Sequence, residues 1–247
     1  MGKLLLTLCF CSFIIFSSNA IAGLLGTKWG GEIGTGAAIN WSLMADGISC
    51  SGLFESATCE TVALENFMPV GFKSELERAF DAWSLVADLT FTEVVDDGSA
   101  FGDTGSESDI RVAGHLFDGL NGVLAHGYYP SSGRGGDIHF DIDEIWKIGF
   151  GGTGVDIFQV MAHELGHALG LRHTDDGIIL DGLSNTPALM DPFYSEQFSG
   201  PQADDIAYVQ YLYGAPVVLE VSAPPMFILF LFSLYGVYSR KSVSHKP

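Results

Sequence analysis

The 247-residue chain is poor in basic residues. It holds 11 Lys and Arg against 30 Asp and Glu, which gives a formal net charge of −19 at pH 7. Electrostatic repulsion therefore opposes binding to a nucleic-acid backbone or to an anionic membrane surface, and we expect no nucleic-acid partner. The surplus of carboxylates suits Ca²⁺, a hard cation that prefers oxygen ligands, although a solvated acidic surface explains the same composition.

Cysteine is scarce too, with 4 in the chain. Two of them lie in residues 1–22, where a lysine precedes an apolar run and the segment ends in a small-x-small cleavage site. These features predict a secretory signal peptide. Its removal leaves Cys50 and Cys59 in an oxidising compartment, where we expect a local disulfide, with two free thiols as the alternative.

Residues 23–215 lack a long linker and an internal repeat, so we expect one domain there. The remaining segment, 216–247, places the apolar run Met226–Tyr238 between a proline pair and a basic tail. This order resembles the bacterial C-terminal sorting signals of the PEP-CTERM type, with Ala223-Pro224-Pro225 in place of their usual Pro-Glu-Pro. A sorting or membrane-anchoring segment is our interpretation, and a buried C-terminal helix is the alternative.

Periodicity predicts the elements of the domain. Apolar residues recur at helical spacing in 72–86, and further helices are expected at about 155–169, ending at Gly170, and within 201–214. Strands are expected at 36–44, 89–94, 108–114 and 121–130. Strands followed and flanked by helices indicate an α+β fold.

The stretch "HELGHALGLRH" carries the chemistry. His163 and His167 share one helix face, and Gly170 lets the chain turn so that His173 returns as a third ligand. Three neutral imidazoles with one open position are typical of catalytic Zn²⁺, and Glu164 is placed to take a proton from a zinc-activated water. The pattern predicts hydrolysis of an amide bond.

The full HExxHxxGxxH motif resembles that of the metzincin metalloproteases, in which a methionine turn follows; "ALMDPFY" supplies Met190. The segments "KWGGEIGTGAAINWS", "DGLNGVLAHGYYPSSGRGGDIHFDIDEIW" and "DDIAYVQYLYG" make the chain similar to the matrixins from Thr27 to Gly214. The resemblance implies a zinc endopeptidase acting on protein or peptide substrates, expected to be a monomer. It also implies a twisted, mostly parallel sheet, three helices and a cleft between two subdomains.

The resemblance further implies a structural zinc and calcium. The candidate zinc ligands are His115, His126 and His139, and the candidate calcium ligands are Asp137 at one site and Asp118, Asp141 and Glu144 at another. Phe117 stands where the family has an aspartate ligand, so the second zinc is held by three protein ligands, completed by an unidentified carboxylate, or lost. A surface histidine at 115 and a solvated acidic loop are the alternatives. An EF-hand does not fit, because Trp146 occupies its required glycine position.

A substrate site is implied as well. Leu124 and Ala125 belong to "NGVLAH", which would be the edge strand that pairs with an extended peptide. Pro192 and Tyr194 would wall the pocket for the side chain after the cut bond and favour an apolar residue. Ordinary core and turn positions are the alternative.

These observations favour a secreted or envelope-anchored zinc endopeptidase. The rival is a catalytically inactive, metal-dependent binding or adhesion module on the same fold, against which the presence of Glu164 argues. We expect no cysteine-switch prosegment, since the predicted signal cleavage directly precedes the domain and Cys50 lacks the surrounding Pro-Arg-Cys pattern.

Overall fold

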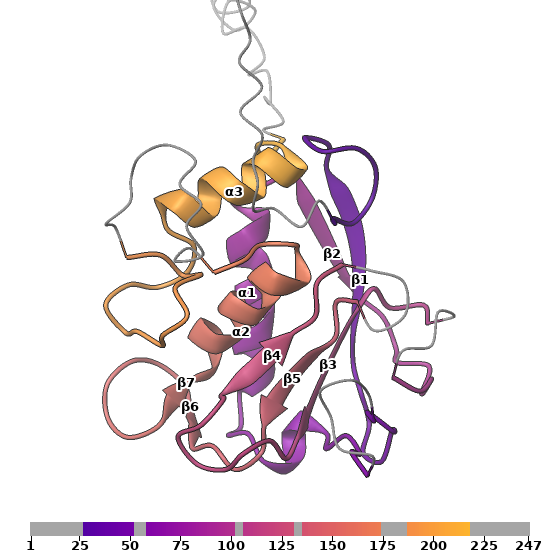
Figure 1. Ribbon diagram of the computed structural model, residues 1–247, viewed down its shortest axis with the longest axis vertical. Helices are drawn as coiled ribbons and strands as arrows, with labels where there is room; N and C mark the ends of the chain where they lie inside the picture. Colours follow the sequence, from indigo (N-terminus) through magenta and orange to yellow (C-terminus); the bar gives the residue numbers. More distant parts are fainter. Residues whose placement is uncertain (1–26, 52–57, 102–105, 131–134, 174–186, 218–247) are drawn as a thin grey trace, which may run out of the picture. The chain divides into compact units, whose positions relative to one another are not determined.

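A computed structural model describes residues 27–51, 58–101, 106–130, 135–173 and 187–217 (Figure 1). Its helices are α1 (Phe72–Ser84), α2 (Ile157–Ala168), α3 (Ala203–Tyr213) and the short 3-10 helix η1 (Leu64–Asn66). Its strands are β1 (Ala37–Leu43), β2 (Leu89–Glu93), β3 (Ile110–His115), β4 (Ala125–Gly127), β5 (Ile138–Asp141), β6 (Trp146–Lys147) and β7 (Val155–Asp156).

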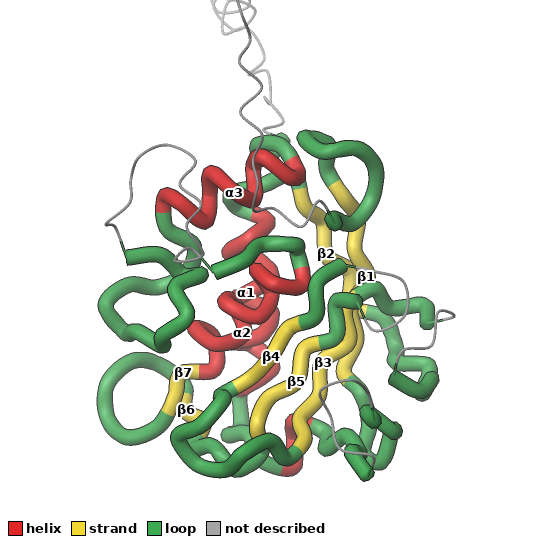
Figure 2. The backbone as a smooth tube through the Cα atoms, viewed as in Figure 1, coloured by secondary structure: helices red, strands yellow, loops and turns green. Residues whose placement is uncertain are grey.

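Five strands form one sheet in the order β2-β1-β3-β5-β4, drawn in yellow in Figure 2. All neighbouring strands run parallel except β4, which is antiparallel to β5 at the sheet edge. The predicted α+β fold with a mostly parallel sheet and three helices is confirmed. Strand β4 is much shorter than the predicted 121–130, because Asn121 has a positive φ of 66° and belongs to a loop.

Helices α1 and α2 pack side by side against the sheet, and α3 lies across their far end (Figure 1). The predicted apolar face of α1 is buried at Leu76, Ala79, Phe80 and Trp83. The indole of Trp83 also donates to the Ala162 carbonyl at 2.9 Å, which ties α1 to α2. Burial of each large side chain on this face contributes about 1.5–3 kcal/mol to stability. Together with the hydrogen bond from Trp83, this packing holds α2 in position.

Helix α2 has clear signals at both ends. Asp156 caps it by accepting the backbone N–H of Gln159 at 2.9 Å, so the helix begins two residues later than predicted. Gly170 follows the helix with φ of 99°, and Leu171 N donates back to Gly166 O at 2.9 Å. This turn, predicted from the glycine, sends the chain back along the helix.

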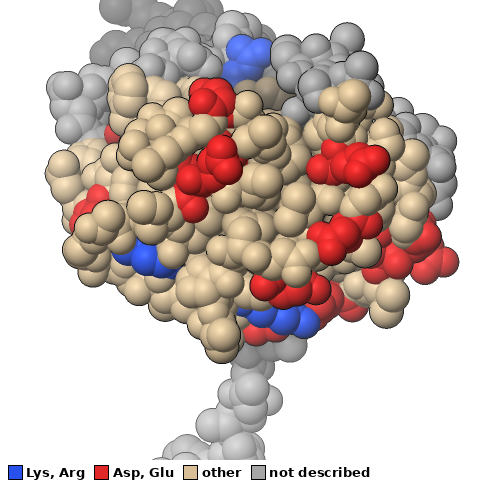
Figure 3. Space-filling view, turned by 90° about the horizontal axis from the view of Figure 1, so that it is seen from below, with Lys and Arg blue, Asp and Glu red and all other residues tan. Residues whose placement is uncertain are grey.

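Cys50 and Cys59 form the expected disulfide, in the segment between β1 and η1. No helix in the described ranges is long and apolar enough to cross a membrane. The predicted signal peptide and nearly all of the predicted C-terminal segment 216–247 lie outside those ranges. Figure 3, which shows the molecule from below, has acidic side chains spread over that face with few basic ones among them.

Candidate metal centre and active-site cleft

Three histidines converge where helix α2 ends. His163 and His167 lie one turn apart on α2, and His173 follows the turn at Gly170. Nε2 of His173 lies 3.3 Å from Nε2 of His163 and 3.2 Å from Nε2 of His167. The predicted ligand set is thus gathered around one point.

Backbone carbonyls orient two of these rings. Nδ1 of His163 donates to Leu189 O at 2.7 Å, and Nδ1 of His167 donates to Leu171 O at 2.8 Å. Burial lowers the pKa of His163 to about 4 and that of His167 to about 3, so both rings are neutral at pH 7. Each then carries its proton on Nδ1 and a lone pair on Nε2. Such lone pairs repel one another unless a cation lies between them, and a set of three imidazoles fits Zn²⁺.

Glu164 follows His163 on α2 and borders a cavity that the three histidines also line. Burial raises the pKa of its carboxyl group to about 8, against the opposing effect of a hydrogen bond from the Gly127 backbone. A cation at the three histidines acts in the opposite direction and favours the carboxylate. A carboxyl group balanced in this way near neutral pH is suited to accept a proton and to return it.

Met190 packs against α2 between the two helical histidines. It is 1% exposed, and its sulfur lies 2.3 Å from the place that a β-carbon on Gly166 would take. Asp205 on α3 accepts the backbone N–H groups of Leu189 at 2.7 Å and Met190 at 3.0 Å. The turn that carries Met190 is therefore fixed by α3, and the same turn supplies the carbonyl that orients His163.

A cavity of about 710 Å³ opens beside the three histidines. Its wall includes Glu164 and all four residues predicted for the substrate pocket, Leu124, Ala125, Pro192 and Tyr194. One side of the cavity is formed by the edge strand β4 and the loop before it, and the other by α2 and the segment after Met190. The structure thus brings the predicted pocket and the predicted metal ligands into one cleft.

A hydrogen-bond network ties the Tyr194 wall to the segment between β6 and β7. The Tyr194 hydroxyl donates to Glu196 at 2.6 Å and accepts the Asp156 N–H at 2.9 Å. Glu196 also forms an ion pair with Lys147 at 2.6 Å and accepts the Gly151 N–H at 2.6 Å. These bonds hold the pocket wall in place across long sequence separations.

Gln159, Tyr129 and Phe198 are among the cavity residues that sequence reasoning missed. Gln159 precedes His163 by one helical turn, so the helical period could have placed it on the metal-facing side. Phe198 comes from an irregular segment without a periodic signal, and Tyr129 lies in the predicted strand 121–130 but beyond the end of β4 at Gly127. The ring of Tyr129 lies edge-on to that of His167, with the centroids 5.6 Å apart.

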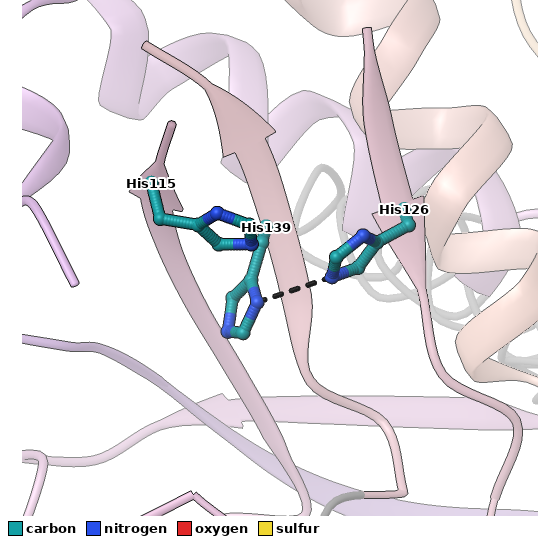
Figure 4. Close-up of side chains that lie close together, drawn as sticks. All are labelled: His115, His126 and His139. Atoms are coloured by element: carbon teal, nitrogen blue, oxygen red, sulfur yellow. Dashed lines mark hydrogen bonds between the residues drawn. The ribbon is translucent and has the colours of Figure 1, made fainter. Parts of the chain in front are cut away.

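A second group of three histidines lies on the sheet (Figure 4). His126 on β4 and His139 on β5 are cross-strand partners, and Nε2 of His126 lies 3.1 Å from Nδ1 of His139. His115 at the end of β3 completes the group. Burial lowers the pKa of His126 to about 3 and that of His139 well below its usual value, so both are neutral donors. The structure therefore gathers all three predicted ligands of the second zinc.

The acidic residues predicted for calcium bind the loop between β3 and β4. Three of the four accept a backbone N–H: Asp118 from Val123, Glu144 from Asn121, and Asp141 from Phe117. Asp137, the fourth candidate, is buried and directly precedes β5, two residues before His139. Among the described residues, the groups of three ligand atoms within 4.8 Å contain only histidines, so these carboxylates stand farther apart than the imidazoles.

Comparisons with known proteins agree with this geometry. Residues 63–214 match the family model Peptidase_M10, Matrixin. Stromelysin-3 of Xenopus laevis is 40% identical over 156 residues, covering 60% of this chain and 29% of the relative. Matrix metalloproteinase-16 of Homo sapiens is 39% identical over 181 residues, covering 67% of this chain and 28% of the relative.

The chain thus spans less than a third of the length of these relatives. Matrixins use zinc and calcium, and each of the two histidine groups has the donors that zinc prefers. The family model covers more than half of the chain, so this chain belongs to the matrixin family of metallopeptidases.

Proposed function

We propose that this chain is a zinc-dependent endopeptidase that hydrolyses peptide bonds in protein or peptide substrates. One observation carries the proposal: three imidazole Nε2 atoms converge beside the buried carboxyl group of Glu164, on the wall of a cavity of about 710 Å³. His163, His167 and His173 would hold the zinc. Bound zinc acts as a Lewis acid that polarises a carbonyl group and lowers the pKa of water to about 7.

Glu164 is the proton carrier of the reaction. Its carboxylate takes a proton from the attacking water and returns it to the nitrogen of the leaving amine. Because the carboxyl group is buried, exchange of that proton with bulk solvent is restricted while the peptide covers the cleft. Met190 supports the site by packing on α2 behind the histidines.

The substrate would lie along the exposed edge of β4 in an extended conformation. Within the described ranges, β4 pairs with β5 on one side only, which supports main-chain hydrogen bonding of a peptide along its other side. Leu124 and Ala125 line the cavity from this strand, and Pro192 and Tyr194 face them across it. This mainly apolar wall supports a preference for an apolar side chain after the cut bond.

The second histidine group and the acidic residues near it lie next to the edge strand β4 and the loop that precedes it. We propose that His115, His126 and His139 bind a structural zinc, that Asp137 contributes to one calcium site and that Asp118, Asp141 and Glu144 contribute to another. Asp118, Asp141 and Glu144 accept backbone N–H groups of the loop that leads into β4, so metals bound there would stabilise the edge on which the peptide lies.

The sequence supports secretion through residues 1–22 and sorting or anchoring at the cell envelope through residues 216–247, with the protein acting as a monomer. Fractionation of cells that express the full chain, or the chain without residues 216–247, tests this localisation. Retention in the envelope only with residues 216–247 supports it, and equal release of both forms contradicts it.

Metal dependence tests the enzymatic proposal. The purified full chain should cleave casein, lose that activity in 1,10-phenanthroline and regain it when zinc is added back. His163→Ala should be inactive at every zinc concentration, with circular dichroism as the control for folding. A folded, zinc-loaded protein without turnover favours the rival binding or adhesion module. Cleavage that the chelator does not affect contradicts a zinc-dependent reaction.

A further inference from the structure

We propose that the second histidine group binds its cation through three imidazoles and no protein carboxylate, leaving one coordination position to a small anion or water from solution. The inference rests on the proposed structural zinc, and it concerns how this chain departs from a site with four protein ligands. Its consequence is a labile, anion-sensitive second zinc.

The backbone fixes the three ligand atoms. Nδ1 of His115 donates to the Leu116 carbonyl at 2.9 Å, which directs Nε2 of this ring toward the group. The other two rings present Nε2 of His126 and Nδ1 of His139, 3.1 Å apart (Figure 4). The three residues come from the neighbouring strands β3, β5 and β4, so the sheet itself sets their spacing. Three ligands arranged in advance lower the entropy cost of binding a cation.

Phe117 occupies the space beside two of these rings. Its ring stacks on His126 with a centroid distance of 4.7 Å and an interplanar angle of 8°, and it lies 4.1 Å from His115. Phe101 and Tyr128 lie against the group on other sides, at 5.4 Å from His139 and 5.0 Å from His126. Aromatic carbon cannot replace a carboxylate as a zinc ligand. Among the described residues, the rings in contact with the three histidines thus present aromatic carbon to them and no carboxylate.

Two acids that lie close in sequence to these histidines, Asp118 and Asp141, make other hydrogen bonds. Asp118 accepts the Val123 N–H through both carboxyl oxygens, at 3.0 and 3.3 Å. Oδ1 of Asp141 accepts the N–H groups of Phe117 and Asp143. In the described part of the chain, neither carboxylate is among the ligand atoms grouped with the three histidines. Asp141 keeps one buried oxygen, Oδ2, with no hydrogen bond to the described residues, which makes it a competitor for the fourth position.

Charge then sets the properties of the site. Three neutral imidazoles leave both positive charges of Zn²⁺ uncompensated by a direct protein ligand, in a buried setting where charge is costly. A small anion from solution lowers that cost by direct coordination. The second zinc should therefore leave faster than it would from a site with a carboxylate ligand, and added anions should slow its release.

Zinc release from the full chain to a chromophoric chelator tests the proposal without any activity assay. We expect two zinc ions per chain, released in two phases, of which one disappears in His126→Ala and the other in His163→Ala. Phe117→Asp should slow the His126-dependent phase by about tenfold or more, because it adds a fourth protein ligand. Phe117→Ala is the matched control, since it removes the ring without adding a donor, and it should not slow release.

Two further arms keep the test decisive if a Phe117 variant fails to fold. Azide should slow the His126-dependent phase of the wild-type chain, and it should slow this phase by the same factor in Asp141→Asn and in Asp118→Asn. The proposal is overturned by a wild-type chain that binds one zinc, by the absence of any effect of azide and of Phe117→Asp, or by an azide effect that appears only in an Asp variant. Absence of casein cleavage with both zinc-release phases intact would contradict the enzymatic proposal and leave the second zinc site supported. The failures of the two proposals are therefore distinguishable.

Discussion

The sulfur of Met190 packs directly against Gly166 of α2. A residue with a β-carbon at position 166 would overlap this sulfur, so the contact requires glycine. Gly166 separates the two histidines of α2, and Met190 follows Leu189, whose carbonyl orients His163. The glycine of the "HELGH" sequence is therefore explained by packing. It allows the methionine turn to approach the helix closely enough to fix a metal ligand.

Gly166→Ala should displace this turn. The added β-carbon overlaps the Met190 sulfur, and overpacking of this kind typically costs about 1–3 kcal/mol. We expect a lower free energy of unfolding and weaker zinc binding, measured by urea titration and by competition with a chelator. Gly166→Ala combined with Met190→Ala should recover part of the loss, because the overlap is gone. Strictly additive effects of the two changes would contradict direct contact.

Gly127→Ala should separate β4 from α2. A β-carbon at this position overlaps the backbone carbonyl of Glu164 and contacts the side chain of His167. A backbone carbonyl cannot rotate away as a side chain can, so we expect the free energy of unfolding to fall by about 1–3 kcal/mol. We also expect kcat/KM for peptide cleavage to fall. Gly31→Ala, at an exposed position, is the control and should change stability by less than about 0.5 kcal/mol. Equal behaviour of the two variants would refute the close approach.

Glu196 gives the pocket wall a defined pH dependence. Hydrogen bonds from Lys147, Tyr194 and the Gly151 N–H lower its pKa from 4.5 to about 2. A carboxyl group whose pKa is depressed on folding stabilises the native state above its unfolded pKa and loses that effect as the pH falls. The difference in Tm between wild type and Glu196→Gln should thus be constant above about pH 5 and shrink from about pH 4.5 to about pH 2.

Glu93→Gln is the control for Glu196, since it removes an exposed ion pair with Lys73 that solvent screens. Its effect on Tm should be small at every pH. A Glu196→Gln difference that persists unchanged at about pH 2 would show that the charge of this residue does not hold the wall.

The disulfide should stabilise the domain mainly by restricting the unfolded chain. Cys50 and Cys59 are 9 residues apart, and closing a loop of this length contributes about 2–3 kcal/mol in the chain-entropy description. The double variant Cys50→Ser, Cys59→Ser should show that loss in urea unfolding, with far-ultraviolet circular dichroism unchanged. Wild type under reducing conditions should match the variant, and an unaltered unfolding midpoint in both would exclude this role.

Local patterns in the sequence were sufficient for the helices and for the metal ligands. Helical periodicity gives the buried face of α1, and the fixed spacing of His163, Glu164 and His167 places them on one face of α2. Gly170 marks the end of that helix because its positive φ is a property of the residue type. These features depend on neighbours within a few positions, which is why the sequence reveals them.

Other features depend on distant partners. The 121–130 segment alternates like a strand, yet the strand itself is only Ala125–Gly127. Glu144 and Asp118 hold the preceding loop through the N–H groups of Asn121 and Val123. Likewise, Glu196 pairs with Lys147 across 49 positions, with no pattern in either segment. Packing and hydrogen bonding between remote segments decide such details, so they emerge only in three dimensions.

The central claim is that Glu164 carries the proton in a reaction at the metal site formed by the three histidines. Its most direct test compares kcat/KM for peptide cleavage by wild type and by Glu164→Gln, at equal measured zinc content. Gln keeps the size of the side chain and cannot accept the proton, so we predict retained zinc and a loss of about 10²- to 10⁴-fold in kcat/KM. Cleavage at the wild-type rate by the zinc-loaded variant would contradict the account.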